Sequence, residues 1–536
     1  MDIALPVLGG LGLFLYGMNL MGTGLQKAAG EKLKKLIEIL TNNRLMGVVV
    51  GALVTMVIQS SSATTVMVIG FVNAGLMTLY QAVGVIMGDN IGTTITAQLI
   101  AFKLTDLAPL AVAIGVGAWI ATSRKRAKNL AEIMIGFGIL FIGMDMMGNG
   151  LKPLAGNPIF SNIMVSLKDP FLGILVGLGL TTILQSSSAS IGLLQALASQ
   201  GLIGLDIAFP ILFGDNIGTT TTALISSVGT NKTAKRAAVI HFLFNLIGTI
   251  IFMTLLRKPI ESIVLRVSPN DIQRQIANAH TLFNILNVAI QLPFARLLVK
   301  AAMKLVPGDV EEATEAGLKF LDLRIIETPS IALGQVTKEI LRMGKIVEDN
   351  LVVAAKAFKN KDEKMTQEVF SQEKVINRLE SDIVRYLVEL SNAPLTDEQH
   401  TQVNILINVV NDIERVGDHA DNIAELAQLG IDERLQFSEE AIEEFDNIFS
   451  KSLEVFKKTL EALRDVDFDK AREVLRLEEE IDSLEKEYRT THIERLNKLL
   501  CQPNSGAIFL DLLSNFERVS DHSSNISLYV LDLLKN

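Results

Sequence analysis

The sequence predicts an all-α protein: a polytopic membrane domain of two inverted repeats with re-entrant or broken helices, followed by a cytoplasmic pair of three-helix bundles. Charge divides the chain, because residues 1–306 carry 22 Lys+Arg against 12 Asp+Glu, whereas residues 307–536 carry 27 against 47. Polar segments recur in the first part 126 residues apart, and a helical block recurs in the second part 103 residues apart. An apolar, net-positive part followed by an acidic part is typical of a membrane domain joined to an aqueous one.

The recurring segments set the limits of the repeats. QSSSATT at 59–65 returns as QSSSASI at 185–191, GDNIGTT at 88–94 returns at 214–220, and GMNLMGTGL at 17–25 matches GMDMMGNGL at 143–151. Glycines of this kind let membrane helices pack closely. We therefore expect a membrane transport domain at 1–306, with repeats at about 4–125 and 130–251 and a final span at about 280–300. A linker at 307–324 leads to the aqueous domain at 325–536, whose halves are expected at about 325–430 and 438–536.

Lysine and arginine in short loops indicate how each repeat is oriented, because they favour the cytoplasmic side. Five basic residues follow the first span, whereas the matching loop at 151–170 has two; the five are Lys27, Lys32, Lys34, Lys35 and Arg44. The bias reverses near the end of each repeat, so the two repeats look inverted. This orientation describes a multi-pass protein of the cell (inner) membrane with an external N-terminus and a cytoplasmic C-terminal domain. The expected external loop at 257–279 disagrees, since it contains four basic residues.

The polar segments interrupt the apolar ones. Residues 45–58 form an apolar stretch of 14 residues, which as a helix is about 21 Å long and falls short of the ~30 Å hydrocarbon layer. We expect a re-entrant hairpin or a broken helix at the QSSS run, since irregular backbone is tolerated where it lines a cavity. Residues 88–94 are expected to interrupt the next apolar segment in the same way.

Two carboxylates of the membrane domain suggest a cation site. Asp89 is the only charged residue between Arg44 and Lys103, and Asp215 is its repeat mate. Charged groups inside a membrane are costly and mark functional sites. With neighbouring amide and hydroxyl oxygens they suit a hard cation such as Na⁺. A helix cap would explain one Gly-Asp-Asn segment, but its duplication favours cation binding.

The serines of the two QSSS runs suit an anion. Each run precedes an apolar stretch that begins a helix, and a helix N-terminus attracts anions. One isolated run would more simply bond back to its own helix, but the duplication favours binding. Neither run contains lysine or arginine, so an anion held there needs co-bound cations to balance its charge. Coupled symport of anion and cation follows from this argument.

On these motifs the chain resembles the sodium/phosphate cotransporter family related to the type II renal and intestinal proteins, which is marked by paired QSSS motifs in inverted repeats. The resemblance covers about residues 4–300. It implies phosphate contacts from the two QSSS runs: Gln59, Ser60, Ser61, Ser62, Gln185, Ser186, Ser187 and Ser188. It implies sodium contacts from Gln59, Asp89, Asn90, Thr93, Gln185, Asp215, Asn216 and Thr219.

Two departures limit what the resemblance transfers. The second polar segment has Ser190-Ile191 where the first has Thr64-Thr65, so the halves need not contribute equally. The animal cotransporters lack the long acidic tail, which points to a bacterial or archaeal branch.

The acidic part shows long amphipathic stretches that begin at Thr328-Pro329 and are separated near residues 392–394, Gly430 and Pro503. The block ERVGDH at 414–419 returns as ERVSDH at 517–522, which predicts two three-helix bundles. In each block an acidic pair lies four residues apart and shares a helix face. The blocks resemble the PhoU family of phosphate-transport regulators, whose E/DxxxD motifs bind metal clusters. The resemblance implies a divalent or iron-type metal held by Glu414, Asp418, Glu517 and Asp521.

We therefore expect sodium-coupled symport of inorganic phosphate into the cell, with a PhoU-like domain in a regulatory role. The alternatives are a sodium symporter for another oxyanion, such as sulfate or a carboxylate, and a membrane-anchored, metal-binding signalling module. No nucleophile and base motif, Walker loop or dinucleotide fingerprint accompanies the repeats, so we expect no enzyme. The expected partners are inorganic phosphate, sodium and the lipid bilayer, with no nucleic acid. Glycine-rich spans and the tail are compatible with a homodimer.

Overall fold

The computed structural model describes residues 3–29, 43–308 and 317–532, which are helical apart from short connections. The predicted all-α class is confirmed for these residues. The chain divides into two compact units, Met1–Glu311 and Glu312–Asn536. Three basic residues used to orient the first repeat (Lys32, Lys34 and Lys35) and part of the expected linker lie outside the described residues.

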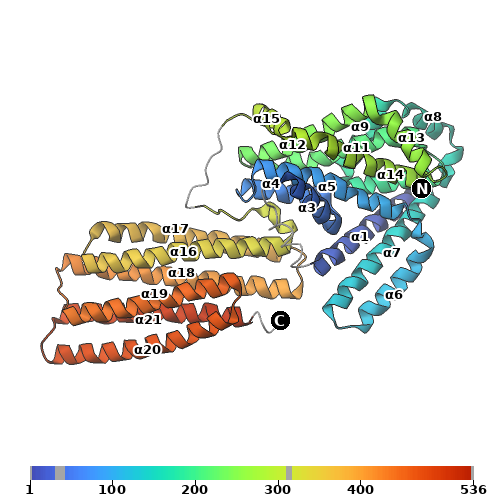
Figure 1. Ribbon diagram of the computed structural model, residues 1–536. Helices are drawn as coiled ribbons and strands as arrows, with labels where there is room; N and C mark the ends of the chain where they lie inside the picture. The colour runs from blue at the N-terminus through green and yellow to red at the C-terminus, as the bar shows by residue number, and fades with distance from the viewer. Residues whose placement is uncertain (1–2, 30–42, 309–316, 533–536) are drawn as a thin grey trace. The chain divides into compact units, whose positions relative to one another are not determined.

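The first unit contains the apolar helices, and its ribbon runs from blue to yellow-green in Figure 1. Five helical stretches are long and apolar enough to cross a membrane, and a bent pair, Pro158–Ser166 with Pro170–Leu184, raises the number to six among the described residues. The helices of this unit are α1 (Ala4–Ala29), α3 (Arg44–Ile58), α4 (Ser61–Asn73), α5 (Leu79–Ile100), α6 (Ala108–Ala121), α7 (Lys125–Leu151), α8 (Pro158–Ser166), α9 (Pro170–Leu184), α10 (Ser187–Ser199), α11 (Leu205–Ser226), α12 (Lys232–Ile251), α13 (Arg257–Val267), α14 (Ile272–Gln291) and α15 (Ala295–Leu305).

The repeat offset is reproduced in the bounds of the helices. α9, α10 and α11 begin and end 126 residues after α3, α4 and α5. α3 packs on α5, and α9 packs on α11 in the same way. α1 of the first repeat packs along α7 of the second, and a Cβ added to Gly17 in this contact would lie 2.3 Å from the backbone nitrogen of Leu140. The close packing that the duplicated glycines predict is therefore confirmed.

One expectation about the membrane helices is wrong. Residues 88–94 interrupt no helix, because α5 runs through them and α11 runs through residues 214–220. Side chains of this segment bond to their own helix, as Thr93 Oγ1 does to the Asp89 carbonyl (3.0 Å), so the polar residues require no break. Residues 257–267 of the expected external loop form α13, and the side of the membrane on which they lie stays a prediction. This helix buries Ile260 and Val264, and its Arg257 donates to the Asp206 carbonyl at 3.0 Å.

The second unit consists of two three-helix bundles that run side by side (Figure 1). A 3₁₀ turn, Leu323–Glu327, precedes the first bundle, which contains α16 (Pro329–Asn360), α17 (Glu363–Ser391) and α18 (Asp397–Asp432). The second contains α19 (Glu439–Asp465), α20 (Phe468–Asn497) and α21 (Pro503–Asp532). The bundles join where α18 packs on α21 and α16 on α19. The helix start at Pro329 and the separation of helices near Pro503 are as predicted.

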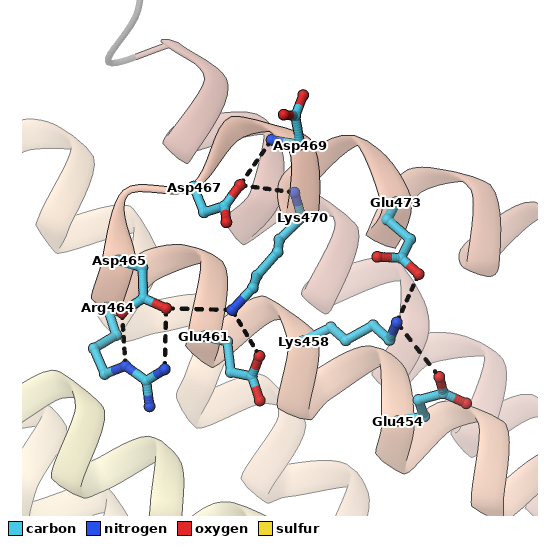
Figure 2. A network of polar contacts seen from close by, with 9 residues as sticks. All are labelled: Glu454, Lys458, Glu461, Arg464, Asp465, Asp467, Asp469, Lys470 and Glu473. Carbon is cyan, nitrogen blue, oxygen red and sulfur yellow. Dashed lines mark hydrogen bonds and ion pairs between the residues drawn. The ribbon is translucent and has the colours of Figure 1, made fainter.

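Polar contacts set the turn between α19 and α20 (Figure 2). Lys470 Nζ lies 2.9 Å from Glu461 Oε2 and 3.3 Å from Asp465 Oδ2, and Asp467 caps the first turn of α20. Hydrogen bonds from Arg464 and Lys470 lower the pKa of Asp465 to about 2. Exposed ion pairs of this kind contribute little to stability. Here they join the end of α19 to the first turn of α20.

Candidate functional site

Each QSSS run forms a break between two helices. Two residues separate α3 from α4, and two separate α9 from α10. Gln59 (φ 58°) and Gln185 (φ 52°) adopt the left-handed conformation that ends the first helix of each pair. Ser60 and Ser186 then cap the second helix, because their Oγ atoms accept the backbone N–H three residues on at 3.1 and 3.2 Å. The hydroxyl proton of each cap is not used in that bond.

The glutamine side chains fasten these breaks to the neighbouring helix. Gln59 Oε1 accepts from Thr96 Oγ1 at 3.0 Å, and Gln185 Oε1 accepts from the repeat mate, Thr222 Oγ1, at 2.7 Å. Their Nε2 atoms donate to the carbonyl three residues earlier, at 2.5 and 2.6 Å. Each break is therefore held by the residue that creates it.

The two aspartates lie beside these breaks and are buried. Asp89 accepts from Thr55 Oγ1 at 2.6 Å through Oδ1 and from Thr65 Oγ1 at 2.9 Å through Oδ2. Asp215 accepts through Oδ1 alone, from Thr181 Oγ1 at 2.9 Å and Ser190 Oγ at 2.7 Å. Its Oδ2 is buried without a hydrogen-bond partner.

A sequence difference between the two QSSS segments explains why Asp89 has a donor at both oxygens and Asp215 at only one. Thr55 and Thr181 are repeat mates, but the position of Thr65 is occupied by Ile191, which has no donor. A buried carboxylate oxygen without a donor favours a cation as its partner.

Glycine allows the aspartates to reach these donors. A Cβ on Gly88 would lie 2.0 Å from the Val48 carbonyl oxygen, and one on Gly214 would lie 2.1 Å from the Ile174 carbonyl oxygen. Side chains at these positions would push α5 off α3 and α11 off α9. The glycine before each aspartate is thus part of the site.

The other residues expected to contact sodium make mostly local bonds. Asn90 Nδ2 donates to the Ile86 carbonyl at 3.1 Å, and Thr219 Oγ1 donates to the Asn216 carbonyl at 2.7 Å. Asn216 reaches further, because its Nδ2 donates to Asn284 Oδ1 of α14 at 3.0 Å. These side chains retain oxygen lone pairs that can bind a cation.

The two halves pack on each other crosswise. α4 contacts α11, and its repeat mate α10 contacts α5. Gln195 of α10 donates through Nε2 to the Ala97 carbonyl of α5 at 3.1 Å. Across the described residues no hydrogen bond joins one QSSS run to the other. Ser187 and Ser188 are buried, Ser60 to Ser62 are half-buried, and Gln185 is exposed.

Side-chain partners of the predicted residues that were absent from the sequence-based set include Thr55, Thr65, Thr96, Thr181, Ser190, Thr222, His280 and Asn284. Two repeat-related threonine pairs in this set, Thr55 with Thr181 and Thr96 with Thr222, could have been found from the 126-residue offset.

Acidic side chains gather in each bundle of the second unit. Glu478, Asp482 and Asp521 offer carboxylate oxygens within 4.8 Å of one another, close enough to share a metal ion. In the first bundle, burial followed by the charges of Asp418, Asp421 and Glu414 raises the pKa of Glu373 to about 8.

Both bundles thus place further acids beside the predicted pairs. Burial and the charge of Asp521 raise the pKa of Glu517. Carboxylate sets of this kind fit a hard cation. The sequence-based prediction omitted Glu373, Glu478 and Asp482, which lie on α17 and α20 rather than on the helices that carry the repeated blocks.

Comparison with known proteins finds family matches for both parts of the chain. A family model described as Na+/Pi-cotransporter matches residues 13–149 and 139–268, and one described as PhoU domain matches residues 340–427 and 445–530. A candidate inorganic phosphate export protein, YjbB of Salmonella typhimurium, is 25% identical over 534 residues, covering 98% of this chain and 97% of that protein. The uncharacterized protein YqeW of Bacillus subtilis is 32% identical over 296 residues, covering 55% of this chain and 95% of that protein. Human sodium-dependent phosphate transport protein 2B is 23% identical over 399 residues, covering 46% of this chain and 58% of that protein.

Apolar helices with duplicated polar segments, followed by two PhoU domains, are the features of a family of phosphate transporters with attached regulatory domains. The chain belongs to the Na⁺/Pi-cotransporter family, and the predicted resemblance to this family and to PhoU is confirmed.

Proposed function

We propose that this protein carries inorganic phosphate into the cell together with Na⁺. The observation that carries the proposal is the pair of buried aspartates, Asp89 and Asp215, each bound to hydroxyl groups beside the N-terminus of a short helix. Phosphate is negatively charged, and no basic residue lies in the duplicated polar segments. Phosphate entry without cations would place uncompensated charge in a low-dielectric site, so sodium and phosphate bind together.

The serine hydroxyls are the proposed phosphate donors. Within the two fully described QSSS runs, the hydroxyls of Ser61, Ser62, Ser187 and Ser188 make no hydrogen bond. The capping serines, Ser60 and Ser186, keep a proton to donate, and the first N–H groups of α4 and α10 add further donors. Gln59 and Gln185 complete the set, their side chains holding the breaks in place.

The sodium sites are proposed at the two aspartates. Asp215 Oδ2 is the strongest ligand available, since it is buried and unpartnered. Asn216 and Thr219 supply further oxygens in that half, and Asn90 and Thr93 supply them beside Asp89. Gln59 and Gln185 are proposed to contact both phosphate and sodium.

The orientation proposed from basic residues makes the repeats inverted, with re-entrant hairpins at the QSSS runs, an external N-terminus and a cytoplasmic PhoU-like part. The short α3–α4 and α9–α10 pairs support hairpins, because none of these four helices exceeds 15 residues. A helix of that length is about 22 Å long, less than the ~30 Å hydrocarbon layer.

Export of phosphate is the second candidate function. It is favoured by the similarity, over 98% of this chain, to a protein whose name assigns it phosphate export. The same site serves either direction, because the gradients of sodium and phosphate set the direction of net flow. Sulfate or a carboxylate remains an alternative cargo for this chemistry.

Phosphate flux in proteoliposomes tests the proposal. An inward Na⁺ gradient should accelerate uptake of radiolabelled phosphate, whereas an equal K⁺ gradient should not. Competition with sulfate and with acetate should leave uptake unchanged. Phosphate flux that is indifferent to sodium would overturn the coupling, and a preference for outward flux under matched gradients would favour export.

For the second unit we propose that metal ions bind Glu414 and Asp418 in one bundle and Glu517 and Asp521 in the other, joined by the acids beside them. Metal binding would regulate transport from the cytoplasm. Elemental analysis of the purified chain, compared with Glu517→Gln, tests this: the variant should lose metal while the duplicated membrane site still binds phosphate. A homodimer is also proposed, and its test is the mass of the protein in detergent.

A further inference from the structure

A further short duplication has a spacing different from that of the 126-residue repeats. HFLFN at 241–245 on α12 returns as HTLFN at 280–284 on α14, 39 residues later. His241, Asn245, His280 and Asn284 are all buried. Each asparagine donates through Nδ2 to the carbonyl of the histidine one turn earlier, at 3.2 Å in α12 and 3.0 Å in α14. The two turns therefore have the same local structure.

α12 and α14 also hold equivalent positions in the fold. α12 packs on α4, α5 and α11, and α14 packs on α10, α11 and α5. Exchanging repeat mates, α4 for α10 and α5 for α11, converts the first set of neighbours into the second. The turns thus form a symmetric pair around the polar segments that the 126-residue offset does not include.

Of these two described turns, only the one on α14 hydrogen-bonds to a polar segment. Asn216 donates through Nδ2 to Asn284 Oδ1 at 3.0 Å, and its Oδ1 lies 3.4 Å from His280 Nε2. In the other half, Asn90 donates to the Ile86 carbonyl instead. Both ring nitrogens of His241 and the Oδ1 of Asn245 are buried without a partner.

We propose that His280 and Asn284 are positioning residues for sodium binding in the second half. This inference rests on the proposed sodium coupling. Asn284 accepts the Nδ2 proton of Asn216 and so fixes the orientation of that amide, on the residue that follows Asp215 in the sequence. Asn245 holds the equivalent place in α12 but makes no such contact, so the two halves bind sodium unequally.

Asn284→Ala tests this, with Asn245→Ala as its matched control. Both variants lose the same bond to a histidine carbonyl at the same burial, but only Asn284→Ala releases Asn216. We expect the sodium concentration for half-maximal phosphate transport to rise about fivefold in Asn284→Ala and to stay within twofold in Asn245→Ala. The KM for phosphate at saturating sodium should stay within twofold in both.

The outcomes separate this inference from the proposed function. Wild-type transport that ignores sodium overturns both. Sodium-dependent wild-type transport with equal half-saturation in the two variants overturns the positioning role alone. If Asn284→Ala fails to fold, His280→Gln and His280→Leu replace it. Glutamine keeps a donor for Asn216 Oδ1 and leucine does not, so only leucine should weaken sodium binding, and identical behaviour of the two would refute the inference.

Discussion

One aspartate oxygen has a hydrogen-bond donor in the first half and none in the second, and a single substitution tests what that bond does. Asp89 Oδ2 accepts from Thr65 at 2.9 Å, whereas Asp215 Oδ2 is unpartnered and Ile191 occupies the position of Thr65. Ile191→Thr places a hydroxyl where the first half has one. A hydrogen bond to a charged group contributes about 1.5–3 kcal/mol. A sodium ion that must displace it should bind about tenfold more weakly or worse, since about 1.4 kcal/mol is tenfold.

Ile191→Val is the control, because valine has nearly the shape of threonine without the hydroxyl. Ile191 is 1% exposed, so both variants lose similar packing. That loss costs about 0.5–1.5 kcal/mol in each, and it cancels in the comparison. The assay is the sodium dependence of phosphate transport in proteoliposomes. Half-saturation should rise about tenfold for Ile191→Thr and stay within twofold for Ile191→Val. Equal values for the two variants would refute the assignment of Asp215 Oδ2 as a sodium ligand.

Ser187→Ala should lower phosphate transport at least about tenfold, because it removes a proposed donor; Ser199→Ala, whose hydroxyl bonds to the Ala196 carbonyl at the end of the same helix, should not. Gly88→Ala should prevent accumulation of folded protein in detergent extracts, since its Cβ would meet the Val48 carbonyl, whereas Gly12→Ala has nothing within 4 Å and should behave as wild type on size exclusion. The pKa of Glu373 is raised from 4.5 to about 8, so its contribution to stability is full below pH 4.5 and is lost as pH rises through about 8. The melting temperature of the chelator-treated chain should therefore fall across that range, and Glu373→Gln should flatten the dependence.

Much of the membrane domain could be predicted because it is duplicated. Two segments of similar sequence are expected to have the same structure, so each supports the prediction made for the other. The 126-residue offset located the helix breaks at Gln59 and Gln185, and helix bounds follow it across α3 to α5 and α9 to α11. The same reasoning failed for residues 88–94. Polar side chains there form hydrogen bonds within a continuous helix. Composition alone does not distinguish such a helix from a broken one.

Partners contributed by distant segments were harder to predict. Thr65 and Ser190 both donate to an aspartate, yet they occupy different positions in their repeats, so alignment of the repeats does not pair them. Asn284 lies 68 residues from Asn216 on a helix outside both repeats. Glu373 and Glu478 have no motif of their own in the acidic part. Such contacts depend on which helices meet, which local patterns do not encode.

Gln59 and Gln185 each have two roles: the backbone ends a helix in the left-handed conformation, and the side chain bonds to the neighbouring helix. Glycine would relax the left-handed backbone at either site, but it would untie the segment from Thr96 or Thr222. Gln59→Asn would keep the backbone conformation but shorten the side chain, so that it no longer reaches Thr96. The left-handed backbone therefore favours glycine, whereas the hydrogen bond to the neighbouring helix requires a long polar side chain. Glutamine forms that hydrogen bond and still adopts the left-handed conformation.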